Sequence, residues 1–203
     1  MLCLTLLLFF SAFLSPLAAD PSSTDSVLLD AYRKENMTVW KEYLDTNDQR
    51  LTTNYLLYEY GYCGYIVAEA KKDGNEALLP EAKRRVQHFK SSVASHQSQM
   101  PTGHYEMYLS AVYVYELRLH ESFHPAKAMS LAKHATRLAP EDPLVLSYYG
   151  TSLFYAPPPF GSKREALAYF EKADRFFSAP QWRFCWIREA TRMYIDQCKA
   201  KLK

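Results

Sequence analysis

The chain has 203 residues, which suits one domain with a substantial core and is short for two full domains. Hydrophobic residues make up 48% of the chain, which excludes a disordered protein. The formal net charge of +2 shows neither the basic footprint of a nucleic-acid-binding protein nor an acidic tail. Sixteen tyrosines accompany only six glycines, and tyrosine suits interfaces as well as cores.

Residues 1–19 predict a secretory signal peptide. They carry no charge, residues 2–14 form a nearly continuous apolar run, Pro16 interrupts it, and two alanines precede Asp20. The usual basic start is missing, and the run is shorter than the roughly 20 residues of a membrane span. We therefore expect a mature chain over 20–203 that is secreted or periplasmic, without a stable membrane span after cleavage. An uncleaved anchor is the alternative.

Apolar residues recur at steps of three and four throughout the mature chain, which is the helical period. Proline-rich and Asp-Gly-Asn segments separate the periodic stretches. This pattern predicts an all-α protein with eight helices, at about 25–45, 48–71, 75–97, 102–121, 125–138, 142–155, 162–177 and 180–200.

The predicted helices contain a repeated pattern of small residues. Superposing Gly61, Ala111, Gly150 and Ala190 aligns a large apolar residue four positions before each and another apolar or small residue three positions after. The helix that follows carries its own row, clearest as Ala166, Phe170 and Ala173 after Gly150. Small residues facing large ones allow close helix packing. We therefore expect Gly150 to lie against the helix that carries Phe170.

This pattern resembles the tetratricopeptide (TPR) repeat over about residues 54–198, and the best unit is Leu146, Tyr149, Gly150, Leu153, Ala166, Phe170, Ala173 and Pro180. The resemblance implies a single TPR-like α-solenoid of antiparallel helix pairs over residues 20–203. The segment 149–173, with Pro157, Phe160, Gly161 and Lys163, also resembles uncharacterised exported helical-repeat proteins of Bacteroidetes, although Ser162 replaces their second glycine. It is similar to the repeat component of some TRAP transporters as well. Neither resemblance implies an activity.

Residues 120–124 match the H-E-x-x-H pattern, in which two histidines on one helical face bind zinc and the glutamate is a general base. The candidate ligands are His120 and His124, with Glu121 as the base. Pro125 follows directly and disfavours helical geometry at His124, and no third ligand is evident. The repeat register also places the motif at a turn, so a chance match is the preferred interpretation.

Other chemistry finds little support in the sequence. Cys63, Cys185 and Cys198 have no spacing typical of a zinc site or a disulfide framework, and they suit buried positions. No phosphate-binding loop, dinucleotide fingerprint or nucleophile elbow occurs. We therefore expect no cofactor and no enzymatic activity.

Aromatic residues form rows along the first helix of each predicted pair. In TPR proteins this helix lines a concave groove, where rings would suit an extended peptide or a glycan. The groove candidates are Tyr55, Tyr58, Tyr62, Tyr65, Tyr105, Tyr108, Tyr115, Phe154 and Tyr194. A compact core filled by the same rings is equally compatible with the sequence.

The sequence thus favours a non-catalytic scaffold that holds a peptide, a partner protein or a small ligand on its concave face. Nucleic acid is not an expected partner. Two alternatives stay open, a zinc-dependent hydrolase that uses His120, Glu121 and His124, and an accessory component of a periplasmic transporter. The sequence does not identify the ligand.

Overall fold

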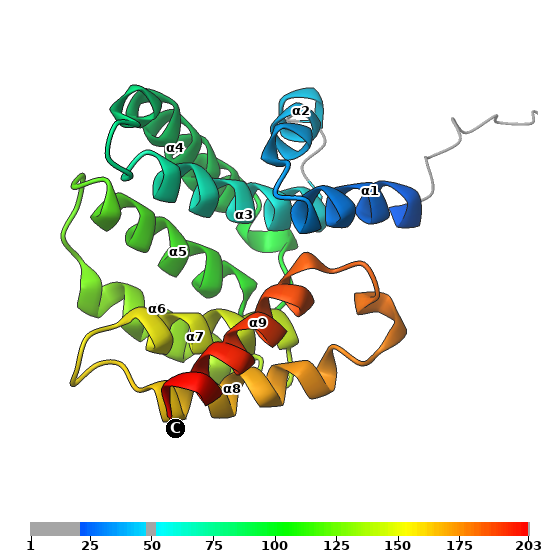
Figure 1. The fold of residues 1–203 in the computed structure, drawn as a ribbon, viewed down its shortest axis with the longest axis vertical. Helices are drawn as coiled ribbons and strands as arrows, with labels where there is room; N and C mark the ends of the chain where they lie inside the picture. The colour runs from blue at the N-terminus through cyan, green and yellow to red at the C-terminus, as the bar shows by residue number, and fades with distance from the viewer. Residues whose placement is uncertain (1–20, 48–51, 203) are drawn as a thin grey trace, which may run out of the picture.

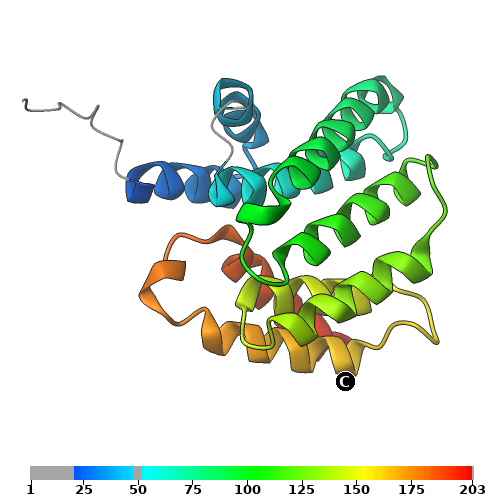
Figure 2. The same ribbon diagram turned by 180° about the vertical axis from the view of Figure 1, so that it is seen from behind.

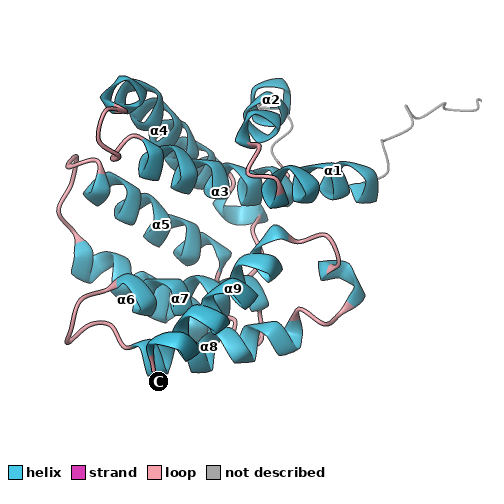
Figure 3. Ribbon diagram, in the orientation of Figure 1, coloured by secondary structure: helices cyan, strands magenta, loops and turns pink. Residues whose placement is uncertain are grey.

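The computed structural model describes residues 21–47 and 52–202, and the elements within them are all helical (Figure 3). The predicted signal peptide therefore lies outside the described residues. The helices of the described part are α1 (Pro21–Arg33), α2 (Met37–Asn47), α3 (Thr53–Glu69), α4 (Leu79–Ser95), α5 (His104–Arg118), α6 (Pro125–Leu138), α7 (Pro143–Tyr155), α8 (Lys163–Phe176) and α9 (Trp186–Lys201). Short 3₁₀ turns at Glu76–Leu78, Gln97–Gln99 and Pro180–Trp182 connect some of them.

The single helix predicted over 25–45 is wrong, because the chain turns between α1 and α2. Glu35 has a φ of 55°, in the left-handed region. The amide of Asn36 donates to the Ala31 carbonyl at 2.9 Å, and the amide of Glu35 donates to the Tyr32 carbonyl at 3.0 Å. This bond pattern is a Schellman helix ending, in which glycine usually takes the left-handed position. Since glutamate takes it here, the sequence offered no visible helix breaker.

Consecutive helices from α3 to α8 pack as three antiparallel pairs, α3 with α4, α5 with α6 and α7 with α8 (Figure 1). The contact that defines the third pair involves Gly150, where a Cβ atom would lie 2.8 Å from the Phe170 ring. Ala166, Phe170 and Ala173 are fully buried. The expected packing of Gly150 against α8 is confirmed.

The last helix, α9, folds back against earlier helices. α9 packs against α8 and α7, and Trp186 at its start also meets Gly61 on α3 (Figure 1). From behind, α4, α6 and α8 form the outer side of the pairs (Figure 2). The TPR assignment and the solenoid remain predictions, since the paired helices alone establish only an all-α fold.

Candidate functional site

A cavity of about 340 Å³ lies where α1, α2, α3 and α9 meet. Four of its eight lining residues are aromatic, and two glutamates, a methionine and a glycine complete the lining. We call it the aromatic pocket, and its lining residues are Tyr32, Glu35, Met37, Trp40, Gly61, Tyr65, Glu69 and Trp186. Binding sites for small ligands typically have volumes of about 300–1,000 Å³ and mostly apolar walls.

Two indole rings and a glycine form the floor of the aromatic pocket. The Trp40 and Trp186 rings meet edge to face with centroids 5.3 Å apart. A Cβ atom on Gly61 would lie 2.6 Å from Trp40 and 2.7 Å from Trp186, so both rings rest directly on the α3 backbone. The Trp40 indole N–H donates to the Leu28 carbonyl at 2.8 Å, which fixes that ring. Any side chain at position 61 would displace an indole.

The side wall formed by α1 is held against α9. The Tyr32 ring lies 5.4 Å from Trp186 and 5.9 Å from Trp40, centroid to centroid. Arg33 forms an ion pair with Glu189 of α9 at 2.7 Å. Burial raises the pKa of the Tyr32 hydroxyl, and the nearby Glu189 charge raises it further. Tyr32 is therefore a neutral ring at physiological pH.

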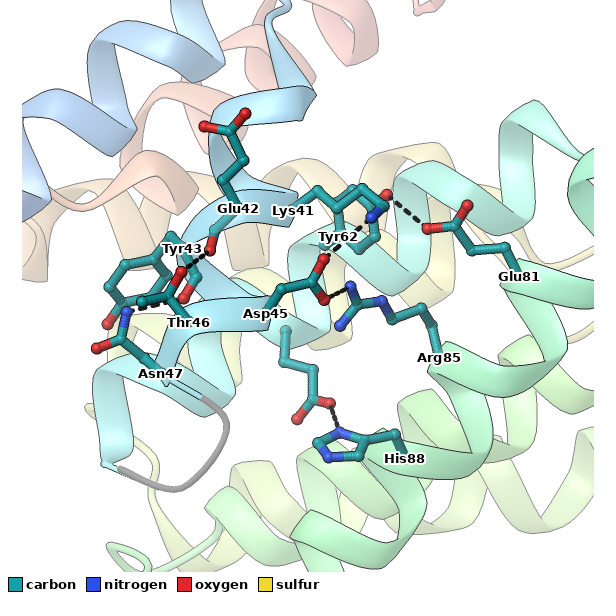
Figure 4. Close-up of polar contacts among 11 residues, drawn as sticks. Lys41, Glu42, Tyr43, Asp45, Thr46, Asn47, Tyr62, Glu81, Arg85 and His88 are labelled. Carbon is teal, nitrogen blue, oxygen red and sulfur yellow. Dashed lines mark hydrogen bonds and ion pairs between the residues drawn. The ribbon is translucent and has the colours of Figure 1, made fainter.

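Polar contacts hold α2 against α4, and they position the Trp40 side of the pocket (Figure 4). Asp45 of α2 accepts hydrogen bonds from Lys41 and from Arg85, a buried arginine of α4. Burial raises the pKa of Asp45, but these two cations outweigh it, so the pKa lies below its usual value. On α4, His88 pairs with the fully buried Glu59 of α3. These contacts are structural, since they lie outside the pocket lining.

The rim of the aromatic pocket carries two carboxylates. Glu69 is paired with Lys72 one turn further along the chain, at 2.5 Å. Glu35 is exposed and forms no ion pair within residues 21–47 and 52–202. The pocket thus combines an apolar interior with a mildly acidic edge.

The structure distributes the nine groove candidates between core and surface. Tyr55, Tyr58, Tyr62, Tyr108, Tyr115 and Phe154 are buried, so the alternative of a compact aromatic core describes these six positions. Tyr105 and Tyr194 are partly buried, and Tyr65 is 38% exposed. Of the nine, Tyr65 is the one that lines the aromatic pocket.

The buried rings are tied into the fold by specific hydrogen bonds. The Tyr115 hydroxyl donates to the Tyr60 carbonyl at 2.9 Å, and the Tyr58 hydroxyl donates to Asp25 at 2.8 Å. Burial, reinforced by neighbouring tyrosines, raises the pKa of Tyr115 well above its ordinary value. Tyr115 therefore links α5 to α3, and Tyr58 links α3 to α1.

The H-E-x-x-H motif does not lie on a helix. His120 ends α5 with a φ of 60°, and the Glu121 amide donates to the Glu116 carbonyl, again as in a Schellman ending. Glu121 is paired with Lys83 at 3.2 Å, and His124 precedes the first residue of α6. The shared helical face that zinc binding at this spacing requires is missing. The part of the chain that the structure describes also contains no group of three potential metal ligands.

Sequence reasoning missed most of the aromatic pocket. Tyr32 and Trp40 precede the repeated units, so the repeat register did not include them. Trp186 was aligned with ordinary core positions such as Leu57, although two of the three tryptophans of the chain converge here. The one available signal was Gly61 itself, because a glycine within a helix indicates close approach of another group.

The fold and the pocket define an all-α protein with a partly open aromatic cavity. No protein-family model matches the chain, and no curated protein matches it. Among solved structures, it is similar to the HusA haemophore from Porphyromonas gingivalis, with a TM-score of 0.65 and 16% sequence identity over 93% of this chain and 98% of that one. At this identity, the likeness establishes a shared fold.

Among the helices of the described residues, none has both the length and the apolar composition that a membrane crossing needs.

Proposed function

We propose that this chain is an exported, non-catalytic ligand-binding protein that carries haem or a related porphyrin, with one edge of the macrocycle in the aromatic pocket. The observation that carries the proposal is the wall of four aromatic rings at the junction of α1, α2, α3 and α9. The fold shared with a haemophore supplies the ligand class. Export rests on the signal-peptide prediction for residues 1–19.

The pocket walls suit a flat, apolar ligand. Tyrosine and tryptophan rings stack on other aromatic systems with a gain of about 0.5–1.5 kcal/mol per pair beyond area burial. Tyr65 is partly exposed beside the cavity, so its ring is available for such stacking. At about 340 Å³ the cavity accommodates part of a porphyrin and leaves the remainder outside.

The pocket also contains atom types that bind haem iron in proteins. Tyr32, Tyr65 and Met37, which carry phenol oxygens and a thioether sulfur, are among its lining residues. Tyrosine and methionine are known axial ligands of haem. Any of these atoms would act on the cargo, so they imply no catalysis.

Titration of the purified mature chain with ferric haem tests the proposal. We expect a saturable shift of the porphyrin absorption band at one haem per chain. Tyr65→Ala should weaken binding by a factor of about 2 to 10, since it removes one stacked ring. Tyr113→Ala is the matched control, because Tyr113 is a partly buried tyrosine whose ring meets His124 edge to face outside the pocket. Absence of any saturable shift would overturn the proposal.

A partner protein or a peptide remains the second candidate for a binding role. It is favoured by the exposed aromatic residues Phe123, Tyr155 and Phe160, which lie outside the aromatic pocket. Capture of a partner that is lost when Phe123 and Phe160 are replaced, while haem binding is unaffected, would favour this second role. The transporter-accessory alternative stays a prediction from the resemblance alone.

A further inference from the structure

We infer that Lys163 and Lys201 form a subsite that binds the carboxylate groups of the ligand. Both ammonium groups lie over the same buried phenyl ring. The Lys163 Nζ is 3.9 Å from the centroid of the Phe154 ring, and the Lys201 Nζ is 4.8 Å from it. Both positive charges are therefore held beside the same ring, where the start of α8 meets the end of α9.

Neither of these two ammonium groups is neutralised by a carboxylate. The ion pairs of residues 21–47 and 52–202 include Lys199, which meets Glu171 at 3.1 Å, but neither Lys163 nor Lys201. Like charges at short range repel each other, and the repulsion is relieved when an anion binds between them. Two carboxylates on one edge of a ligand would satisfy both cations.

A third positive charge acts on the same region. Arg118, at the end of α5, is exposed and belongs to none of the ion pairs among the described residues. Burial raises the pKa of the Tyr194 hydroxyl, and the positive charge of Arg118 opposes that rise. Arg118 thus adds a positive charge near Tyr194, whereas the rim of the aromatic pocket carries the carboxylates of Glu35 and Glu69.

Aromatic groups next to the two lysines suit the body of a planar ligand. Tyr155 is 66% exposed, and its hydroxyl lies 3.2 Å from the hydroxyl of Tyr194. The Tyr194 ring packs against Phe154, with centroids 5.3 Å apart. Together these groups match an aromatic carboxylate. The exposed ring suits the aromatic part of such a ligand, and the hydroxyl donors and the two cations suit its carboxylates.

The backbone fixes the position of these groups. The end of α9 lies beside the start of α8 in both views of the molecule (Figures 1 and 2). Lys163 is the first residue of α8, and Ser162 caps that helix by accepting a hydrogen bond from the Glu165 amide. A Cβ atom on Gly161 would lie 2.0 Å from the Ala156 carbonyl oxygen, so the preceding loop is tightly closed.

The lysine subsite and the aromatic pocket share one helix. Trp186 and Tyr194 are eight residues apart on α9, which corresponds to about 12 Å along the helix axis. Ala190 and Cys198 continue the same four-residue spacing. The inference rests on the proposed function, since it assigns the carboxylate edge of a porphyrin to the lysines and another edge to the pocket side of α9.

The test compares ferric haem with its dimethyl ester, which keeps the macrocycle and iron but lacks the carboxylate charges. The wild-type chain should bind the diacid about five- to tenfold more tightly than the ester, the range expected of two partly exposed charge pairs. The double variant Lys163→Gln/Lys201→Gln should bind the diacid with the affinity of the ester. Added salt should reduce the wild-type preference.

A matched control separates this subsite from general charge effects. Lys127→Gln/Lys199→Gln removes the same charge, and Lys127 also lies over an aromatic ring, that of Tyr113 at 4.7 Å. This control should retain the preference for the diacid. Equal binding of diacid and ester by the wild type, or an unchanged preference in the Lys163/Lys201 variant, would overturn the inference alone. Failure of both compounds to bind would overturn the proposed function and the subsite with it.

Discussion

Gly61 and Gly150 occupy the same position in the repeated pattern, yet they pack against different kinds of neighbour. Gly150 faces Phe170 on α8, the next helix in the chain. Gly61 faces Trp40 on α2 and Trp186 on α9, which is more than a hundred residues away. The same small residue therefore builds a local helix pair in one region and a long-range junction in the other.

The two regions around these glycines differ in whether they leave room for a ligand. In the paired region, α5 to α8, small alanines face large rings, and the interior is filled. At the junction of α1, α2, α3 and α9, bulky rings meet at angles that leave a cavity of about 340 Å³ between them. A ligand site is thus expected at the junction and not between paired helices.

The largest expected effect concerns the rings that join the two regions. Tyr108 is fully buried and Tyr115 is 6% exposed. In the variant Tyr108→Ala/Tyr115→Ala, the free energy of unfolding should fall by about 3–5 kcal/mol for each ring removed. The total is comparable with the whole stability of a domain. We therefore expect no folded protein by circular dichroism at ambient temperature. Tyr65→Ala/Tyr155→Ala, which removes two exposed rings, should melt close to the wild type. A folded Tyr108/Tyr115 variant would show that these rings line a groove after all.

A smaller effect tests the comparison of the two glycines directly. Gly61→Leu and Gly150→Leu should each lower the free energy of unfolding in urea by about 1–3 kcal/mol, because each leucine overpacks a filled contact. Gly61→Leu should also weaken haem binding more than Gly150→Leu does. It displaces Trp186 from the pocket wall, whereas Gly150→Leu reaches the ligand only through Phe170 and the Tyr194 ring stacked on it.

Two outcomes would break that comparison. An unchanged melting temperature in Gly150→Leu would place Gly150 at the surface and invalidate the repeat register. Equal weakening of haem binding by both substitutions would show that the paired region and the junction act as one unit.

The sequence predicted the local parts of the fold well. The period of apolar residues indicated an all-α chain, and the small residues around Gly150 and Ala166 correctly identified the packing of α7 on α8. Helix pairs of this kind follow from neighbours in the chain. The missed helix ending at Glu35 depends on a left-handed glutamate, which no propensity indicates.

The candidate site was largely beyond sequence reasoning. Tyr65 was a candidate because it is an aromatic residue on a first helix, but the other rings of the aromatic pocket, Tyr32, Trp40 and Trp186, come from three other helices. Their meeting depends on how far α9 folds back toward α3. That geometry is set by the sum of all crossing angles between the helices, and periodicity within one helix does not contain it.

The smallest expected effect concerns the helix caps of the paired region. Asp142 begins α7 and accepts hydrogen bonds from the amides of Leu144 and Val145, at 2.9 and 3.1 Å. His104 lies 3.0 Å from its other oxygen. α9 at the junction has no side-chain cap at Cys185. α7 is thus capped by a residue next to it in the chain, whereas α9 is not. In the same way, Gly150 packs against the next helix in the chain, whereas Gly61 also packs against the distant α9.

Asp142→Ala should lower the free energy of unfolding by about 0.5–2 kcal/mol at pH 7, the usual range for a lost cap. Burial raises the pKa of Asp142, but the bonds from His104 and from the two amides outweigh it, so the pKa is lowered. The pKa of Asp142 is lower in the folded chain than in the unfolded chain. The charged cap therefore contributes its full stabilisation of the fold above about pH 4, and progressively less as the pH falls through the folded pKa. Urea denaturation from pH 7 to pH 3 should therefore show the difference between wild type and variant shrinking with acid. Ser162→Ala, which removes the uncharged cap of α8, should have an effect that stays constant with pH. A pH-independent effect of Asp142→Ala would mean that its carboxylate charge contributes nothing to the start of α7.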